Sequence, residues 1–443
     1  MLFDDSAADR ASGGSARDFA RGILAVLAIF LTTRLVVWTA AYGGAVIHFR
    51  IQFQIEPPWQ ERTAALKQKI EDENTPEHYA IHRRLSDFNP LTNFDGQHYR
   101  SIIVKGYQYA PVRPAQPASE RQQNIAFFPL YPLICSALTS VLTPNQAMVL
   151  VANTAALFAC VLGYFWIRRR IDERAALFFV AAISCFPSAC YFSFAYAESV
   201  TLLATVSTMM LIDRRSFWAA AVVCGLATAS RPTAFGLVPV LMLAYWFNSP
   251  KPQRRVAVLA ALTVVASAGI AAYAVYLTAR FGSPLVYATN FRMGWIPDHD
   301  RPDWFEFLTL ARVWDQFKYF GRAFVGFPAG LPNLLYPFAW NMPVNFSILF
   351  LSVAGLWRVP RSFRPLLLLG PFIFLHSYIA GGGANFGVEP IGRYMAVAVP
   401  AFAVLAAWCT REWRAGLRYM LLAGMLFIEA AWAFHFGLDE WSG

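Results

Sequence analysis

An acid, a glycine, an imidazole and a cation stand close together in the segment Asp95–Arg100, which lies between long apolar runs. A carboxylate in such a place can take a proton from a hydroxyl group, and a nearby imidazole can help to shape the site for that hydroxyl. The dipeptide Asp95-Gly96 favours a turn, so we expect the carboxylate on a tight bend rather than inside a helix. A solvated turn between two membrane segments is the alternative, and these residues alone leave it open.

Four more ionisable residues stand inside or at the ends of apolar runs: Arg34, Glu198, Arg231 and Arg393. A charge at membrane depth is costly, so residues of this kind are functional candidates by default. Guanidinium groups can hold a phosphate at two points, and a nearby carboxylate can then accept a proton from an acceptor hydroxyl. The alternative role is structural, with Glu198 pairing with Arg34 or Arg231 to hold a helix bundle together.

The composition indicates a membrane protein with several spans. The chain has 443 residues, of which 57% are hydrophobic and 14% are charged, whereas about 25% charged residues are typical of a soluble protein. The net charge of +10 is distributed over short turns, and no basic patch with interleaved aromatic residues indicates nucleic-acid binding. The six cysteines lie within or beside apolar runs, without the spacing of a disulfide framework or a metal site. No nucleotide-cofactor or zinc motif is visible, so we assign no metal ligands and leave a divalent metal open.

The positions of the basic turns predict the topology, because positive residues gather in cytoplasmic turns. Five arginine-rich turns fall on the cytoplasmic side if the N-terminus is cytoplasmic and only one span lies between residues 126 and 167. We therefore expect 127–142 to be a juxtamembrane or re-entrant helix, interrupted by Pro129 and Pro132. The five turns are Arg168–Arg170 with Arg174, Arg214-Arg215, Lys251 with Arg254-Arg255, Arg358 to Arg364, and Arg411 to Arg418.

With all five basic turns on the cytoplasmic side, the apolar runs predict an all-α polytopic bundle of about eleven transmembrane helices. A cytoplasmic tail, 1–21, precedes one transmembrane domain, 22–443, with a first outer loop at 48–145 and a second large outer loop at 280–332. The first loop contains a charged surface helix at Glu61–Arg84, and the aromatic and arginine residues of the second favour interfacial anchoring over ligand contact. Several spans are short, which indicates tilted or discontinuous helices. The spans are expected near 22–47, 146–167, 175–196, 198–212, 216–230, 233–248, 256–279, 333–356, 365–380, 394–410 and 419–436.

Six short segments along the chain carry a common pattern, namely Phe94–Tyr99, Gly106-Tyr107, Phe127–Pro132, Tyr196–Ser199, Ser230–Pro232 and Arg393-Tyr394. In this order they resemble the GPI mannosyltransferase II (PIG-V-like) family of the GT-C glycosyltransferase superfamily. The chain departs from the family pattern at Phe94, where Trp is usual, and at Thr233-Ala234, where Asn-Gly is usual. These departures concern the sugar and the acceptor more than the fold.

The resemblance implies a GT-C-like bundle with an active site at the outer face, Asp95 as the catalytic acid residue and Glu198 as the supporting one. We expect Asp95 to act as general base, with Glu198 and His98 shaping the acceptor side. Arg393 is expected to bind the donor phosphate, assisted by Arg231 and Tyr394. Acceptor or loop support is assigned to Asp87, Gly96, Tyr99 and Arg100, and Asp87 and Glu198 are the competing candidates for the base.

The expected reaction is the transfer, with inversion, of a hexose, with mannose favoured, from a polyprenyl-phosphate donor to a glycolipid, glycan or protein acceptor. It would take place at the extracytoplasmic face of the inner membrane of a bacterium or of the endoplasmic reticulum of a eukaryote. The alternative is a lipid-linked saccharide flippase or a polymerase-type membrane protein. A transporter should carry its charges near the midplane and show paired repeats, whereas here most charges fall at one face and no repeat is visible.

Overall fold

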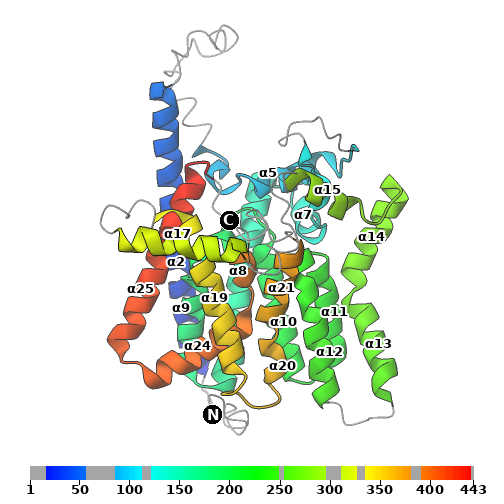
Figure 1. Ribbon diagram of the computed structural model, residues 1–443, viewed down its shortest axis with the longest axis vertical. Coiled ribbons are helices and arrows are strands. Elements are labelled where there is room, and N and C mark those ends of the chain that lie inside the picture. Colours follow the sequence, from blue (N-terminus) through cyan, green and yellow to red (C-terminus); the bar gives the residue numbers. More distant parts are fainter. Residues whose placement is uncertain are drawn as a thin grey trace.

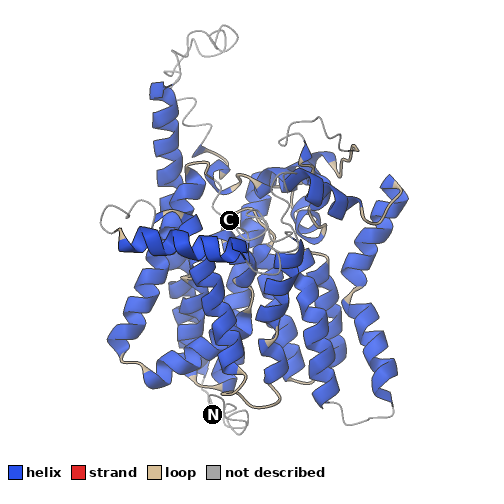
Figure 2. Cartoon of the chain, viewed as in Figure 1, coloured by secondary structure: helices blue, strands red, loops and turns tan. Residues whose placement is uncertain are grey.

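The computed structural model describes residues 16–55, 85–111, 121–248, 254–295, 311–326, 335–380 and 391–440. All regular structure within these ranges is helical (Figure 2), as the apolar composition predicts. The expected surface helix at Glu61–Arg84 lies outside the described residues. The same holds for the part of the second outer loop between 296 and 310.

Within the described ranges, three helices are long and apolar enough to cross a bilayer, namely α2 (Ala16–Ile55), α8 (Pro144–Arg170) and α25 (Ala415–Gly437). Helix α8 begins with a capping box between Thr143 and Gln146 and ends on three arginines, which favour the negative end of the helix dipole. Helices α2 and α25 cross closely, because Gly437 has no side chain where a Cβ would clash with the Ala41 carbonyl. The predicted first span is therefore present, but the helix starts before residue 22 and continues to Ile55.

Several other predicted spans are interrupted. The predicted continuous span at 175–196 is wrong as a single helix: α9 (Glu173–Ser184) ends and a 3₁₀ segment, η4 (Pro187–Phe192), follows. Proline at the start of η4 has no backbone N–H to continue the α-helical pattern. A second 3₁₀ segment, η5 (Pro232–Gly236), lies between α11 (Phe217–Thr228) and α12 (Leu237–Asn248), where the expected spans 216–230 and 233–248 meet. The discontinuous helices that short apolar runs predict are thus present.

A bend of 55° also divides α13 (Arg255–Ala266) from α14 (Ala268–Phe281). If this pair is one span, four segments of the described residues meet the length and apolarity needed for crossing; eleven spans stay a prediction. Helix α17 (Ala311–Val325) lies across the upright helices in Figure 1. The other helical elements, in chain order, are η2 (Asn89–Leu91), α5 (Asp95–Lys105), η3 (Asn124–Ala126), α7 (Leu130–Ser136), α10 (Glu198–Asp213), α15 (Val286–Trp295), α17 (Ala311–Val325), α19 (Pro337–Gly355), α20 (Arg364–Leu367), α21 (Leu369–Ala380), α23 (Ile391–Met395) and α24 (Val399–Glu412).

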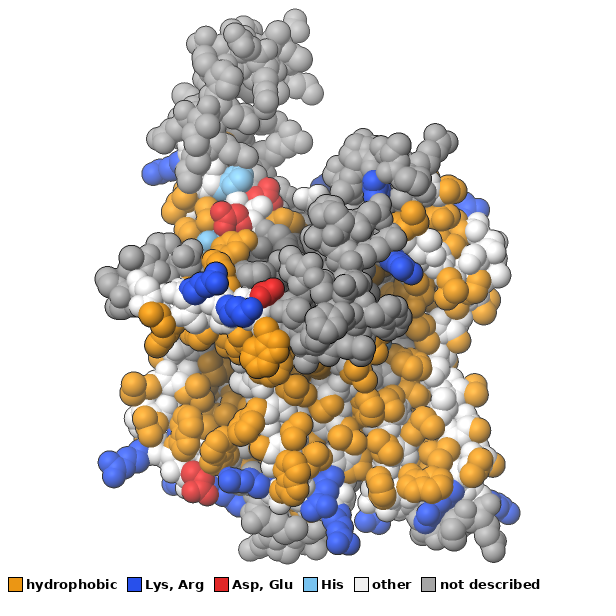
Figure 3. Space-filling model, in the orientation of Figure 1, with side chains coloured by type: hydrophobic (Ala, Val, Ile, Leu, Met, Phe, Trp, Pro, Cys, Tyr) orange, Lys and Arg blue, Asp and Glu red, His pale blue; other side chains and the backbone are white. Residues whose placement is uncertain are grey.

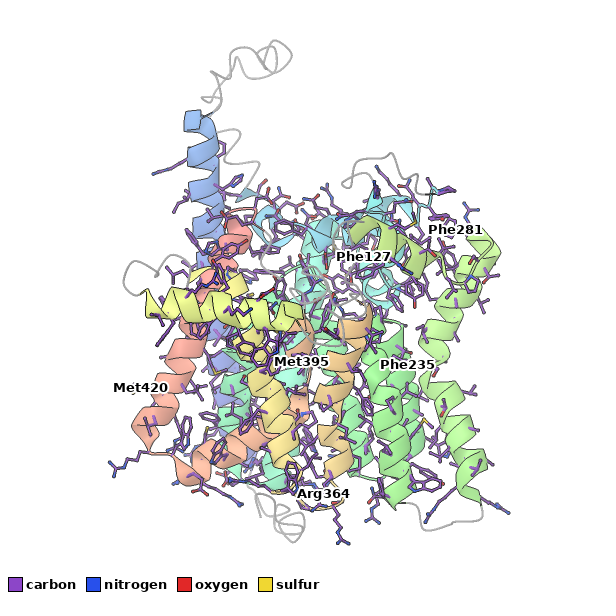
Figure 4. The ribbon with its side chains drawn as sticks, viewed as in Figure 1. Phe127, Phe235, Phe281, Arg364, Met395 and Met420 are labelled. Carbon is purple, nitrogen blue, oxygen red and sulfur yellow. The ribbon has the colours of Figure 1, made fainter. Side chains whose placement is uncertain are left out.

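The arginine-rich turns gather at one end of the bundle. In Figure 3 basic side chains line the lower rim, below a broad hydrophobic belt, and Arg364 is labelled at this end in Figure 4. Contacts between turns that are distant in sequence agree with this arrangement. They are Arg170 Nε to Asp213 Oδ2 at 2.6 Å, Trp166 stacked on Phe363 at 5.7 Å, Arg358 over Trp408 at 5.6 Å, and Phe19 on Phe165 at 5.0 Å.

The two segments predicted to be outer loops meet at the opposite end, where α5, α7 and α15 lie together (Figure 1). Asn290 of α15 donates to the Arg121 carbonyl at 3.0 Å, and Tyr273 of α14 donates to the Ile125 carbonyl at 2.7 Å. Helix α7 has seven residues and extends about 10 Å, too short to cross a hydrocarbon core of about 30 Å. The assignment of this end to the extracytoplasmic side stays a prediction.

Candidate active site

Asp95 and Arg393 form a buried ion pair at the end of the bundle that carries α5. Arg393 Nη1 donates to Asp95 Oδ2 over 2.8 Å, and each residue is 5% exposed. Three tyrosine rings surround the guanidinium group, with centroids at 5.1 Å for Tyr394, 5.5 Å for Tyr196 and 5.7 Å for Tyr191. These rings provide a cation–π environment that favours an arginine over other residue types.

Glu198 and Arg231 extend this pair into a cluster of four charges. Glu198 forms an ion pair with Arg231, and its Oε1 also lies 3.5 Å from Arg393 Nε. The Arg231 guanidinium lies 4.7 Å from the centre of the Tyr394 ring, which is therefore shared by both arginines. Two acids and two arginines sum to a formal charge of zero. The pairing of Glu198 with Arg231, which the sequence left as a structural alternative, is thus present inside the predicted site.

The backbone around Asp95 is fixed from both sides. Phe94, directly before it, has a φ of +53°, an uncommon value for a residue with a side chain. The Asp95 N–H donates to the Tyr196 hydroxyl at 3.3 Å, and the Ala195 N–H donates to the Leu91 carbonyl at 2.8 Å. These bonds join the first predicted outer loop to the start of α10 and bring Asp95 beside Glu198. Asp95 and Gly96 are the first two residues of α5, so the expected bend at this dipeptide is wrong. The turn comes one residue earlier, at Phe94.

Glu198 and Arg231 are positioned by the ends of helices. Glu198 is the first residue of α10, where the positive end of the helix dipole favours a carboxylate. Arg231 follows α11 and has an extended backbone, with a φ of −158°, because the proline after it disfavours the helical conformation. Helix α10 has 16 residues and so places Glu198 about 24 Å from its other end, at Asp213, which pairs with Arg170.

His98 and Tyr99 lie on α5, beside the cluster. The His98 ring stacks on Phe127, with 4.7 Å between the centroids. Burial lowers the pKa of His98 below its usual 6.5, and the nearby Asp95 carboxylate opposes this in part. Tyr99 is buried with its ring against Tyr131 at 4.9 Å, and burial raises the pKa of its hydroxyl. Near neutral pH both groups are therefore uncharged.

Three other predicted residues have different surroundings. Gly96 faces Ala195, and a Cβ built on it would lie 3.4 Å from the Ala195 methyl group, which is an ordinary van der Waals contact. Asp87 accepts a hydrogen bond from Thr143 at 2.5 Å, at the start of α8, and contacts none of the four charges in any described interaction. Arg100 is exposed on α5.

Arg34 belongs to a separate buried pair. Its Nη2 lies 2.8 Å from Glu429 Oε1 of α25, so the possibility that Arg34 pairs with Glu198 is wrong. Sequence reasoning missed Glu429, although a lone acid inside the last apolar run is a signal of the same kind as Arg34. It also missed Tyr191 in the ring cage, because an aromatic residue in an apolar run has no distinguishing pattern.

Metal-ligating groups are few near the cluster. The described residues contain no group of three or more His, Cys, Asp and Glu side chains that could hold a metal ion. Asp95 and Glu198 are the two carboxylates of the site, and both are engaged by arginines.

No protein-family model and no curated protein matches this chain. Among solved structures it is similar to ArnT from Cupriavidus metallidurans bound to undecaprenyl phosphate, with a TM-score of 0.43 and 15% identity over 74% of this chain and 56% of that one. It is also similar to the apo oligosaccharyltransferase of Archaeoglobus fulgidus, with a TM-score of 0.43 and 15% identity over 94% of this chain and 56% of that one. The chain thus spans little more than half the length of either protein.

Proposed function

We propose that the protein is a membrane glycosyltransferase of the GT-C type, which transfers a hexose from a polyprenyl-phosphate carrier to an acceptor hydroxyl at the outer face. The observation that supports this most strongly is the cluster of Asp95, Glu198, Arg231 and Arg393, at the bundle end opposite the arginine-rich turns. A purely structural pair needs one acid and one arginine. Here two of each converge from four separate elements at one end of the bundle.

The proposed chemistry assigns one task to each part of the cluster. The acceptor oxygen attacks the anomeric carbon while the bond from that carbon to the phosphate oxygen breaks, and Asp95 takes the hydroxyl proton. The donor is a phosphodiester with one negative charge, and it leaves as a polyprenyl phosphate monoester with one more. Arg393, assisted by Arg231, stabilises the charge that develops on the leaving phosphate. Attack from the face opposite the leaving group inverts the configuration of the sugar.

Donor binding must change the pairing inside the cluster, because its formal charge is zero without ligand. Arg393 Nη1 occupies Asp95 Oδ2, so a lone pair of the proposed base is engaged by the residue proposed to bind phosphate. A phosphate that takes over Arg393 would release that oxygen. The general base would therefore become available when the donor is present.

Mannose and the polyprenyl carrier rest on the resemblance of Phe94–Tyr99, Tyr196–Ser199 and Arg393-Tyr394 to the PIG-V-like family. His98, held neutral by burial on the same face of α5 as Asp95, is assigned to the acceptor side. The acceptor class is a glycolipid, glycan or protein that carries a free hydroxyl at the membrane surface.

The test is a transfer assay on the purified protein in lipid nanodiscs. Polyprenyl-phosphate mannose and polyprenyl-phosphate glucose are supplied separately with a panel of hydroxyl acceptors, and released polyprenyl phosphate is measured. Release that depends on acceptor and is lost in Asp95→Asn supports the proposal. Movement of the intact lipid-linked sugar across the membrane of proteoliposomes, without release of polyprenyl phosphate, would identify a flippase instead.

A further inference from the structure

The break between α9 and η4 leaves backbone carbonyl groups inside the bundle without a continuing helix. A buried carbonyl without a hydrogen bond is costly, particularly at membrane depth. Arg34 of α2 supplies the missing donors: its Nη2 donates to the Ser184 carbonyl at 2.6 Å and its Nη1 to the Ala189 carbonyl at 2.8 Å. The same Nη1 lies 3.0 Å from the Ser193 hydroxyl. One side chain therefore binds both sides of the break.

Glu429 compensates the charge of Arg34 and fixes its direction. Its Oε1 accepts from Arg34 Nη2 at 2.8 Å, and the two residues are 0% and 5% exposed. A buried pair of this kind contributes little net stability compared with apolar residues, whereas its hydrogen bonds to two backbone carbonyls fix the geometry of the break. Through it α2 and α25 together determine where η4 begins.

Segment η4 in turn holds the residue next to Arg393. The Ser188 hydroxyl donates to the Gly392 carbonyl at 2.9 Å, and the Gly392 N–H donates to Asn341 Oδ1 at 3.0 Å. Both backbone groups of Gly392 are thus bound, and a Cβ at this position would lie 2.5 Å from Asn341 Oδ1. Tyr191 of η4 also lies under the Arg393 guanidinium at 5.7 Å.

We propose that Arg34 is a positioning residue for Arg393. Arg34 and Glu429 locate η4, η4 locates Gly392 through Ser188 with Asn341 on the other side, and Gly392 orients the next side chain toward Asp95. The effect on phosphate binding rests on the proposed function of Arg393. The structural connection between Arg34 and the backbone of residues 391–395 is independent of that function.

The experiment compares Arg34→Lys, Ser188→Ala and Arg170→Lys in the full chain. Lysine keeps the charge but lacks the planar fork that reaches two carbonyls at once. Arg170→Lys is the matched control, because Arg170 also pairs with a carboxylate, Asp213, and also donates to a backbone carbonyl, but at the other end of the bundle. Ser188→Ala removes a single hydroxyl and decides the matter if Arg34→Lys does not fold.

Two measurements test separately whether Arg34 affects the backbone of residues 391–395 and whether it affects the binding of polyprenyl phosphate. Hydrogen exchange of a peptide covering 391–395 should speed up about tenfold or more in Arg34→Lys and Ser188→Ala and stay unchanged in Arg170→Lys. Binding of polyprenyl phosphate should weaken by about 10- to 10²-fold in the same two variants, while the KM for the acceptor changes little. The two losses should not multiply in the double variant Arg34→Lys with Ser188→Ala, since both act through η4.

An unchanged rate of hydrogen exchange at 391–395 in both Arg34→Lys and Ser188→Ala would overturn the inference. An equal increase of this rate in the control Arg170→Lys would also overturn it. If exchange at 391–395 is faster in the two variants but the wild-type protein binds no polyprenyl phosphate, the connection between Arg34 and this segment stands and the proposed function is rejected. Faster exchange together with unchanged polyprenyl phosphate binding would overturn the role of Arg34 in positioning Arg393 for its ligand.

Discussion

Arg393 Nη1 lies 2.8 Å from Asp95 Oδ2, although 298 residues separate the two in the chain. Asp95 begins α5 in the first predicted outer loop, and Arg393 lies on the short α23 before the last two helices. The pair therefore joins an early segment of the chain, just after α2, to a late one, just before α24. Glu198 and Arg231, from the middle of the chain, complete the same cluster.

The substitution Asp95→Asn is expected to lower sugar transfer by at least about 10²-fold, because an amide keeps the size of the carboxylate but cannot accept the proton. Folding, membrane insertion and binding of polyprenyl phosphate should persist. Asp87→Asn is the control, since Asp87 bonds to Thr143 and not to the cluster. If Asp87→Asn abolishes transfer while Asp95→Asn retains it, the base is misassigned.

Replacing Arg393 by lysine should reduce transfer by about 10²-fold, because an ammonium group lacks the planar, two-point contact by which a guanidinium group stabilises the charge on the leaving phosphate. Arg292→Lys is the matched change on an exposed arginine of α15, which has no assigned role, and should have no effect. Membrane insertion and the elution profile of the purified protein check that both variants fold. Near wild-type turnover in Arg393→Lys would make Arg393 a structural partner only.

Glu198 competes with phosphate for both arginines, so Glu198→Gln should tighten binding of polyprenyl phosphate. The substitution changes the formal charge of the cluster from zero to +1, and we expect roughly a fivefold effect, equivalent to about 1 kcal/mol. Transfer should fall less than in Asp95→Asn. Isothermal titration in nanodiscs measures the affinity, and weaker binding would mean that Glu198 instead holds the arginines in their binding geometry.

The pH dependence of stability should show the contribution of neutral, buried His98 to the folded protein. Burial lowers the pKa of His98 in the folded protein, so the unfolded chain takes up a proton at a higher pH than the folded one. The stability associated with neutral His98 is thus complete above about pH 6.5 and is lost as the pH falls below that value. His98→Phe keeps a ring to stack on Phe127 and has no proton to gain. The unfolding temperature of the wild type should therefore drop more steeply than that of His98→Phe between pH 6.5 and 5, and parallel curves would contradict this.

Thiol labelling tests which end of the bundle faces outward. The six native cysteines are buried, so the unmodified chain serves as the unlabelled control. Lys105→Cys on α5 and Arg169→Cys in the first arginine-rich turn are both exposed. An impermeant maleimide added outside intact cells should label position 105 and spare position 169. Labelling of 169 alone would reverse the topology.

The sequence by itself determined the class of this protein and most of its chemistry-bearing residues. Apolar runs of about 20 residues and arginine-rich turns are local patterns, governed by the cost of burying polar groups in lipid. For that reason the membrane character, the gathering of the basic turns at one end and the candidacy of Asp95, Glu198, Arg231 and Arg393 could all be predicted. Breaks in several helices could also be anticipated from short runs and prolines.

Only the tertiary structure decided which charge pairs with which. The sequence marks Arg34, within the first span, and Arg231, at the junction of two spans, as candidates but does not fix their partners. In the structure Arg34 binds Glu429 and the broken end of α9, while Arg231 binds Glu198. An ion pair depends on side-chain atoms within about 4 Å, and such distances follow from the close packing of helices far apart in sequence, as where Gly437 of α25 meets α2. The clamp on Gly392, the tyrosine cage around Arg393 and the role of Glu429 arise in the same way, because each depends on contacts that no local pattern encodes.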